Sequence, residues 1–191
     1  MKILVIDNYD SFTYNLVHSI KKFHKEIEVF RNDQISLEQV EAYDKILLSP
    51  GPGVPDQANM LKPIIEKYGP TKSIFGVCLG QQAICEVYGG SLLNTKEVYH
   101  GVASLVEVDL DEVLFKGLES KIEVGRYHSW VVNPDDFPSV LKVTATGPKG
   151  EIMALAHQSH DVRAVQFHPE SVLTPMGDKI IENWLNHNPK P

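Results

Sequence analysis

The fold of this chain is decided by the run Ser73-Ile74-Phe75-Gly76-Val77-Cys78-Leu79-Gly80. Its first part, residues 73–77, is largely apolar, and a segment with helical spacing of apolar residues follows near Gln81. Glycines two residues before and two residues after Cys78 permit a sharp, strained turn between a strand and a helix. Such a turn points the first amides of the helix at whatever bonds to the sulfur, which stabilises a thiolate or an oxyanion. The run therefore predicts a nucleophile at the carboxyl end of a buried strand.

A histidine and a carboxylate lie far downstream, in His168-Pro169-Glu170. A histidine can act as the base for a cysteine, and a carboxylate two residues further on can orient the imidazole. Taken alone, a cysteine in an apolar strand is usually a small core residue, and a His-Pro-Glu sequence is usually a loop. The glycine-flanked Cys78 together with His168 and Glu170 favours catalysis over packing.

Composition limits the remaining possibilities. The 191 residues suit one domain, residues 1–191, and the formal net charge of -7 argues against nucleic acid and anionic membranes as partners. The first residues have too short an apolar run for a signal peptide, and no stretch is long enough to span a membrane. Cys78 and Cys85 lack the spacing of a zinc site, and so few cysteines do not build a disulfide framework. We therefore expect a cytoplasmic protein that holds no metal.

The first half of the chain alternates strands with helices. Strands are expected at residues 2–7, 26–31, 45–49 and 73–77, and helices at 12–23, 36–41, 59–68 and 81–88. This alternation predicts a parallel sheet that is covered on both faces. Asp10 or Ser11 is expected to cap the first helix. Because ligands bind beyond the carboxyl ends of such strands, residues 7–11, the loop at 50–53 and Cys78 should converge.

The second half reads as strands joined by turns, followed by one helix. The expected strands are residues 91–110, 122–132, 141–146, 152–157 and 163–167. Residues 147–150 are typical of a hairpin connection. Thr174 is expected to cap the final helix, with Pro175 at its first position, and residues 186–191 are expected to fray.

The sequence resembles the class I (triad) glutamine amidotransferases nearly from end to end. Within them it is similar to the small subunit, component II, of anthranilate synthase and aminodeoxychorismate synthase. The motifs that carry the resemblance are IDNYDSFTYNL (6–16), SPGPG (49–53), GVCLGQQ (76–82), Lys96 with His100-Gly101, RYHS (126–129) and QFHPES (166–171). The first of them narrows the match to the chorismate-using branch. The resemblance implies a flavodoxin-like α/β fold, with a central, mostly parallel sheet flanked by helices and extra antiparallel strands in the C-terminal half.

The resemblance also implies a role for each motif. Cys78 would attack the carboxamide of glutamine, His168 would activate it and protonate the departing ammonia, and Glu170 would hold the imidazole. The amides of Leu79 and Gly51 would form the oxyanion hole. The implied glutamine-binding residues are Gly51, Pro52, Gly53, Gln82, Ser129 and Trp130. The ammonia would pass to a chorismate-binding synthase large subunit, component I. The resemblance implies no cofactor in this subunit and Mg²⁺ in the synthase partner.

Four polar residues are implied to lie at the interface with that partner, namely Asp10, Ser11, Lys96 and His100. Taken alone, Asp10 and Ser11 would be read as a helix cap, and His100 as an ordinary surface histidine. His128, which follows Tyr127 on an expected strand, is expected to be structural rather than catalytic.

Several functions remain open from the sequence. The likeness at residues 172–175 favours anthranilate synthase and tryptophan synthesis over aminodeoxychorismate synthase and folate synthesis, and one subunit could serve both. A catalytically silent regulatory or scaffolding subunit is an alternative of another class. Such a relative would have lost Cys78, His168 or Glu170, and all three are present. A third alternative is a hydrolase of other γ-glutamyl or peptide bonds, against which the glutamine-holding residues argue.

Overall fold

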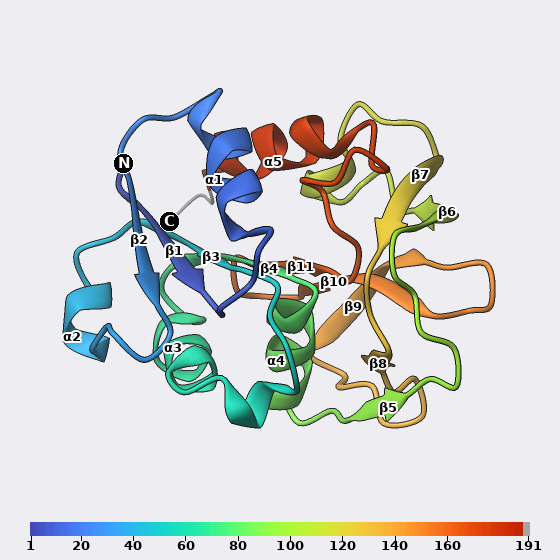
Figure 1. The fold of residues 1–191 in the computed structure, drawn as a ribbon, viewed down its shortest axis with the longest axis horizontal. Helices are drawn as coiled ribbons and strands as arrows, with labels where there is room; N and C mark the ends of the chain where they lie inside the picture. The colour runs from blue at the N-terminus through green and yellow to red at the C-terminus, as the bar shows by residue number, and fades with distance from the viewer. Residues whose placement is uncertain (189–191) are drawn as a thin grey trace.

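One large sheet organises the computed structural model, which describes residues 1–188 (Figure 1). Its strands are β1 (Ile3–Asp7), β2 (Ile27–Arg31), β3 (Lys45–Leu48), β4 (Ser73–Val77), β6 (Val102–Val108), β7 (Lys121–Arg126), β9 (Leu141–Thr146), β10 (Ile152–His157) and β11 (Val162–Val165). They lie in the order β2-β1-β3-β4-β11-β10-β9-β6-β7. The pairs from β2 to β11 are parallel, and those from β11 to β7 are antiparallel. The predicted mostly parallel centre with added antiparallel strands is confirmed.

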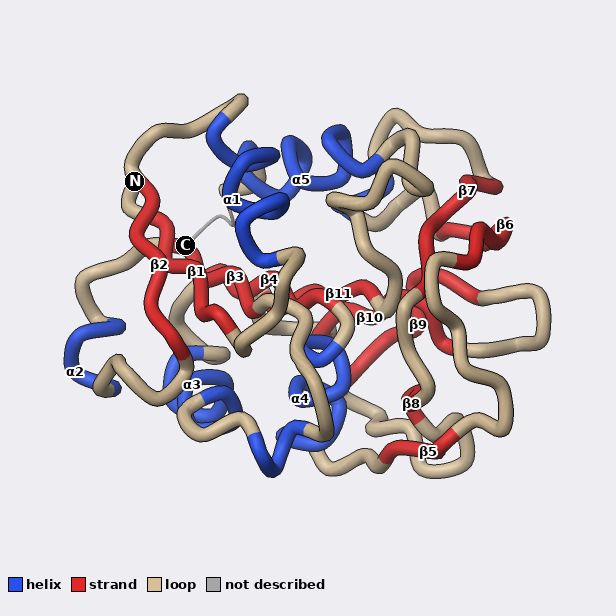
Figure 2. The backbone as a smooth tube through the Cα atoms, viewed as in Figure 1, coloured by secondary structure: helices blue, strands red, loops and turns tan. Residues whose placement is uncertain are grey.

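Helices cover both faces of the parallel part of the sheet, as Figure 2 shows. The helices are α1 (Thr13–Lys21), α2 (Leu37–Val40), α3 (Leu61–Tyr68), α4 (Leu79–Val87) and α5 (Gly177–Asn186), with short 3-10 turns at Pro55–Gln57 and Val113–Phe115. α1 and α5 lie together on one face, and α3 and α4 lie together on the other. Among residues 1–188, no helix is long and apolar enough to cross a membrane.

The core divides into two layers because successive side chains of a strand point to opposite faces. On β4, Phe75 lies in the cluster under α1 and α5, where its ring is 5.5 Å from that of Trp184. Its neighbour Ile74 lies in the cluster under α3 and α4. Every residue of β4 is buried, which explains why its sequence is a continuous apolar run rather than an alternating one.

Two of the expected strands are wrong in extent. Residues 91–110 form β5 (Leu92–Asn94) and β6, separated by a loop in which Gly101 has a φ of 71°. Residues 122–132 likewise form β7 and β8 (Trp130–Val132), separated at residues 127–129. β5 and β8 pair with each other in a small second sheet. Both expected strands are broken because β5 and β8 lie outside the large sheet and pair with each other. The apolar content of the sequence does not reveal this pairing.

The expected starts of the first and last helices are also wrong. Phe12, not Asp10 or Ser11, is the N-terminal cap residue of α1, and no side chain caps it. α5 begins at Gly177 with Met176 as its cap residue, because the hydroxyl of Thr174 donates to the carbonyl of His168 instead. α5 continues to Asn186, so the expected fraying from residue 186 starts too early, and residues 189–191 lie outside the described part of the chain.

Candidate active site

Cys78 stands on the turn between β4 and α4, as predicted. Its φ of 54° and ψ of -100° lie where residues other than glycine are rarely found, so the turn is strained. The amide of Cys78 donates to the carbonyl of Val165 at 2.8 Å, which ties the turn to the end of β11. This geometry agrees with a nucleophile held on a sharp strand-to-helix turn.

The two glycines that flank Cys78 are required by close packing. A methyl group on Gly76 would lie 2.7 Å from the backbone of Gly80. A methyl group on Gly80 would lie 2.7 Å from the carbonyl oxygen of Leu48 on β3. The start of α4 therefore lies directly against β3 and β4, and only glycine at both positions allows that approach.

Gly80→Ala is therefore expected to destabilise the protein by about 1–3 kcal/mol, because backbone atoms of β3 and α4 must move apart. The free energy of unfolding in urea measures the loss. The same shift displaces the amide of Leu79, so glutamine hydrolysis should fall as well. An unchanged unfolding midpoint would show that the contact with Leu48 relaxes without cost.

His168 and Glu170 follow β11, the strand next to β4, so the sheet brings them to Cys78. Nδ1 of His168 lies 2.6 Å from Oε1 of Glu170, and both side chains are buried. Burial opposes the charge of the imidazole, but the neighbouring Cys78 and Glu170 outweigh it and raise the pKa of His168. Within residues 1–188, Nε2 of His168 has no hydrogen-bond partner, so it is free to exchange a proton with a reacting group.

Two aromatic side chains that sequence reasoning did not single out hold the imidazole of His168 in place. The ring of Tyr127 lies 4.8 Å from it, and that of Phe12 meets it edge-on at 5.6 Å. The hydroxyl of Tyr127 lies 3.0 Å from that of Ser171, which fixes the ring from the other side. Both aromatic residues belong to motifs quoted above, but only the fold shows that they share one neighbour.

Gly51 and Leu79 are brought together as predicted. A methyl group on Gly51 would lie 2.7 Å from the side chain of Leu79 and 2.6 Å from Cβ of Asn8. Within residues 1–188, the amides of Gly51 and Leu79 donate no hydrogen bond to the protein. Two free amides beside a nucleophile can bind a developing oxyanion.

A ladder of side-chain amides, of which Asn8 and Asn32 are buried, supports the loop that carries Gly51. Asn8 donates from Nδ2 to the carbonyl of Ser49 at 2.8 Å, and its backbone amide donates to the hydroxyl of Ser49 at 2.9 Å. Asn32 donates to Asn8, and Asn59 donates to Asn32. The loops after β1, β2 and β3 are therefore fixed to one another beside the predicted oxyanion hole. The sequence predicted that the ends of β1 and β3 converge, but it did not identify the end of β2 or the asparagines.

The remaining predicted glutamine-binding residues lie on two sides of Cys78. Pro52 and Gly53 follow Gly51 on the loop after β3, and Gly53 has a φ of 71° that favours glycine. Gln82, on α4, is buried and donates to the carbonyl of Trp130 at 3.0 Å. The carbonyl of Ser129 accepts a hydrogen bond from the amide of Thr95 at 2.7 Å. The hydroxyl of Thr95 lies 3.0 Å from the same carbonyl but has its shorter contact with the carbonyl of Glu97.

A further contact to the sulfur comes from Gln166. This residue belongs to the motif QFHPES, but the sequence predicted no role for it. Nε2 of Gln166 lies 3.4 Å from Sγ of Cys78, and the side chain is fully buried. Its position on the residue after β11, beside the turn of β4, follows from strand pairing that the sequence does not display.

The four predicted interface residues are at the surface near this site. Ser11, Lys96 and His100 are exposed, and Asp10 is partly exposed. The ring of His100 meets that of Tyr127 edge-on at 6.0 Å, so the 95–101 loop reaches the aromatic residues around His168. Within the described residues, no group of three or more His, Cys, Asp or Glu side chains is arranged to hold a metal ion.

Fold and site together define an α/β protein in which a cysteine on a strained strand-to-helix turn lies beside a buried histidine–carboxylate pair. The chain belongs to the class I glutamine amidotransferases, because the family model described as glutamine amidotransferase class-I matches residues 4–188.

Relatives of known assignment cover almost the whole chain. Aminodeoxychorismate/anthranilate synthase component 2 of Bacillus subtilis is 42% identical over 96% of this chain and 95% of the relative. Anthranilate synthase component 2 of Pseudomonas aeruginosa is 42% identical over 96% of this chain and 94% of the relative. Aminodeoxychorismate synthase component 2 of Escherichia coli is 41% identical over 96% of this chain and 99% of the relative.

Solved structures share the fold. A structure from Thermoplasma acidophilum superposes with a TM-score of 0.86 at 26% identity, over 97% of this chain and 92% of that chain. A glutamine amidotransferase from Thermotoga maritima superposes with a TM-score of 0.74 at 17% identity, over 89% of this chain and 76% of that chain.

Proposed function

We propose that this chain is the cytoplasmic glutaminase subunit of a chorismate-using synthase. It hydrolyses L-glutamine to glutamate and ammonia and passes the ammonia to component I. The observation that carries the proposal is the buried His168–Glu170 pair, 2.6 Å apart, beside Cys78 on a strained turn. A catalytically silent subunit would have no use for that arrangement.

In the proposed mechanism, His168 takes the proton of the Cys78 thiol, and the sulfur attacks the carboxamide carbon of glutamine. The amides of Gly51 and Leu79 stabilise the oxyanion that forms. His168 then protonates the departing ammonia, which leaves a γ-glutamyl thioester on Cys78. Water attacks the thioester with His168 again as base, releasing glutamate and restoring the thiol. Glu170 keeps the imidazole in one orientation throughout and supports its positive charge.

The pocket that holds glutamine is proposed to lie between the loop at residues 51–53 and the segment Ser129–Trp130, with Gln82 at its base. The polarity of these groups suits an amino acid, because backbone amides and one side-chain amide are the polar groups they offer. No cofactor is proposed for this subunit, and Mg²⁺ is assigned to the synthase partner.

Component I is proposed to dock where the exposed predicted residues lie, at Asp10, Ser11, Lys96 and His100. Large apolar side chains are exposed near the same motifs, since Val172 is 95% exposed, Val98 is 74% exposed and Tyr14 is 65% exposed. Apolar side chains exposed to this degree beside a catalytic site suit burial by a partner. An enclosed contact would also keep ammonia from being protonated in bulk water.

Anthranilate synthase is the proposed partner, on the sequence likeness at residues 172–175. The relatives named above carry both assignments at nearly equal identity, so aminodeoxychorismate synthase is the second candidate. The test mixes the purified chain separately with an anthranilate synthase and an aminodeoxychorismate synthase large subunit, and measures product from chorismate and glutamine. Anthranilate alone is the expected result. Aminodeoxychorismate alone would reassign the partner, and both products would make the subunit shared. A stable complex that uses ammonia but not glutamine would contradict the glutaminase proposal.

A further inference from the structure

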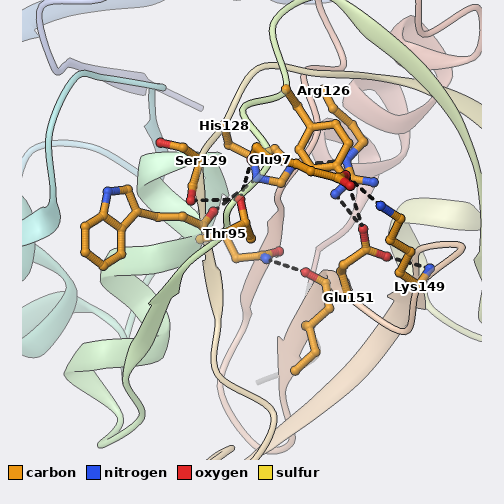
Figure 3. Close-up of polar contacts among 11 residues, drawn as sticks. Thr95, Glu97, Arg126, His128, Ser129, Lys149 and Glu151 are labelled. Atoms are coloured by element: carbon orange, nitrogen blue, oxygen red, sulfur yellow. Dashed lines mark hydrogen bonds and ion pairs between the residues drawn. The ribbon is translucent and has the colours of Figure 1, made fainter.

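A buried arginine lies behind the predicted glutamine pocket and takes no part in the proposed reaction. Arg126, at the end of β7, has no exposed surface. Its guanidinium donates to Oε1 of Glu151 at 2.8 Å (Figure 3). The ring of Tyr99 covers the guanidinium at 3.6 Å. A buried charge that is paired and stacked in this way is held in one position, because any other leaves it without a partner.

Arg126 fixes the protonation of its neighbour His128. Nε of Arg126 lies 3.1 Å from Nε2 of His128, and a guanidinium can only donate, so Nε2 must be the acceptor. Nδ1 of His128 therefore carries the proton and donates to the carbonyl of Trp130 at 3.1 Å. Burial and the charge of Arg126 lower the pKa of His128 to about 4. The imidazole is thus neutral, and in a single tautomer, near neutral pH.

The carbonyl of Trp130 connects His128 to the side chains that contact the sulfur of Cys78. It accepts a second hydrogen bond from Nε2 of Gln82 at 3.0 Å, which fixes which end of that amide is nitrogen. The same nitrogen donates to Oε1 of Gln166 at 3.3 Å. Nε2 of Gln166 then faces Sγ of Cys78 at 3.4 Å. Each hydrogen bond determines the direction of the next, so this series of hydrogen bonds ends with an N–H group of Gln166 that points at the sulfur of Cys78.

The polarity of the final contact matters chemically. An N–H group stabilises a thiolate, whereas a carbonyl oxygen in the same place would repel it. Gln166 has both groups, and only its hydrogen bond with Gln82 decides which one meets the sulfur. Gln82 in turn is oriented by the Trp130 carbonyl, whose direction His128 helps to set.

We propose that Gln166 is a further catalytic residue, which donates a hydrogen bond to the thiolate of Cys78, and that Arg126 and His128 are positioning residues that act through the Trp130 carbonyl and Gln82. The inference deepens the proposed function, because it concerns the same nucleophile. Its test is independent of glutamine hydrolysis, since it follows the reactivity of the sulfur itself.

The first test measures the rate of alkylation of Cys78 by iodoacetamide between pH 5 and pH 9, in the full chain. Cys78→Ala gives the background from Cys85. Gln166→Met, which keeps the shape but has no donor, should lower the rate at pH 7 about tenfold, since a hydrogen bond to a charged group contributes about 1.5–3 kcal/mol. Gln166→Glu keeps the shape and the acceptor for Gln82 but faces the sulfur with an oxygen and adds a negative charge, so its loss should be larger.

Gln166→Met carries the test, because the charge of Gln166→Glu disfavours the thiolate whether or not Gln166 donates to it. If Gln166 only fills space, Gln166→Met should react as fast as the unchanged protein, and that result would overturn the proposal.

The second test uses a matched pair at His128. An asparagine places its nitrogen where Nδ1 stood and can still donate to the Trp130 carbonyl, whereas a glutamine reaches the Nε2 position and can accept from Arg126. His128→Asn should keep the alkylation rate within about twofold, and His128→Gln should lower it about threefold, a fraction of one hydrogen bond. Near-equal rates, or a larger loss in His128→Asn, would show that His128 serves only to pair Arg126. Circular dichroism and the urea midpoint establish that each variant is folded.

Discussion

Cys78→Ser is expected to abolish glutamine-dependent product formation by the assembled synthase while leaving ammonia-dependent formation intact. A serine hydroxyl at this position is a far weaker nucleophile than a thiolate, and His168 is placed to serve a thiol. The loss should reach about a thousandfold or more, as is typical when a nucleophile is removed from a group that acts as a unit. The measurement is the rate of product formation from chorismate, first with glutamine and then with an ammonium salt at high pH.

Cys85→Ala is the matched control for that change. Cys85 is the second cysteine of the chain, fully buried on α4, and burial raises its pKa to about 12, so it supplies no thiolate near neutral pH. The control should keep glutamine-dependent activity with a modest loss of stability. Glutamine-dependent activity that survives in Cys78→Ser would remove Cys78 as the nucleophile.

His168→Ala is expected to reduce glutamine hydrolysis at least as strongly as Cys78→Ser does. It removes the group proposed to move the proton in both halves of the reaction. Glu170→Gln should cost less, about 10–100-fold, since the glutamine carbonyl can still accept from Nδ1 of His168 while the charge is lost. Steady-state glutaminase rates of the two variants in complex with component I provide the comparison.

The Glu170→Gln variant carries a second readout. Glu170 raises the pKa of His168, so loss of its charge should lower that pKa and shift the pH profile of hydrolysis to lower pH. A loss from Glu170→Gln equal to that from His168→Ala would show that the charge, rather than the orientation of the imidazole, is the main contribution of Glu170.

The parallel half of the fold could be predicted from the sequence because its signals are local. The central strands β1, β3 and β4 are short, largely apolar runs buried on both faces. Pro50 follows soon after β3, and β4 leads directly into a helix with regular spacing. The antiparallel half was predicted less well. The breaks at residues 95–101 and 127–129 arise because β5 and β8 pair with each other outside the large sheet. That pairing depends on tertiary contacts rather than on local sequence.

The proximity of the three proposed triad residues was predictable for a related reason. A cysteine between two glycines carries the signature of the turn that displays it, and His168 with Glu170 forms a compact motif. The groups that surround the triad have no such local signature. Tyr127, Phe12 and Gln166 approach it from different elements. The pairing of β11 with β4 places Gln166, and tertiary packing of the segments after β7 and before α1 places the two aromatic rings. The prediction that residues 1–191 form a single domain stays a prediction.

The position of β11 also determines when, during synthesis of the chain, the proposed active site can form. It is the last strand within residues 1–188, yet it lies in the interior of the sheet, between β4 and β10. While the chain emerges from the ribosome, β1 to β4 can pair early. The edge of β4 stays unpaired until β11, more than 80 residues downstream, has been synthesised. A nascent chain therefore carries Cys78 without the proposed base, His168. Under the proposed mechanism such a chain cannot hydrolyse glutamine, and an unpaired strand edge of this kind favours aggregation.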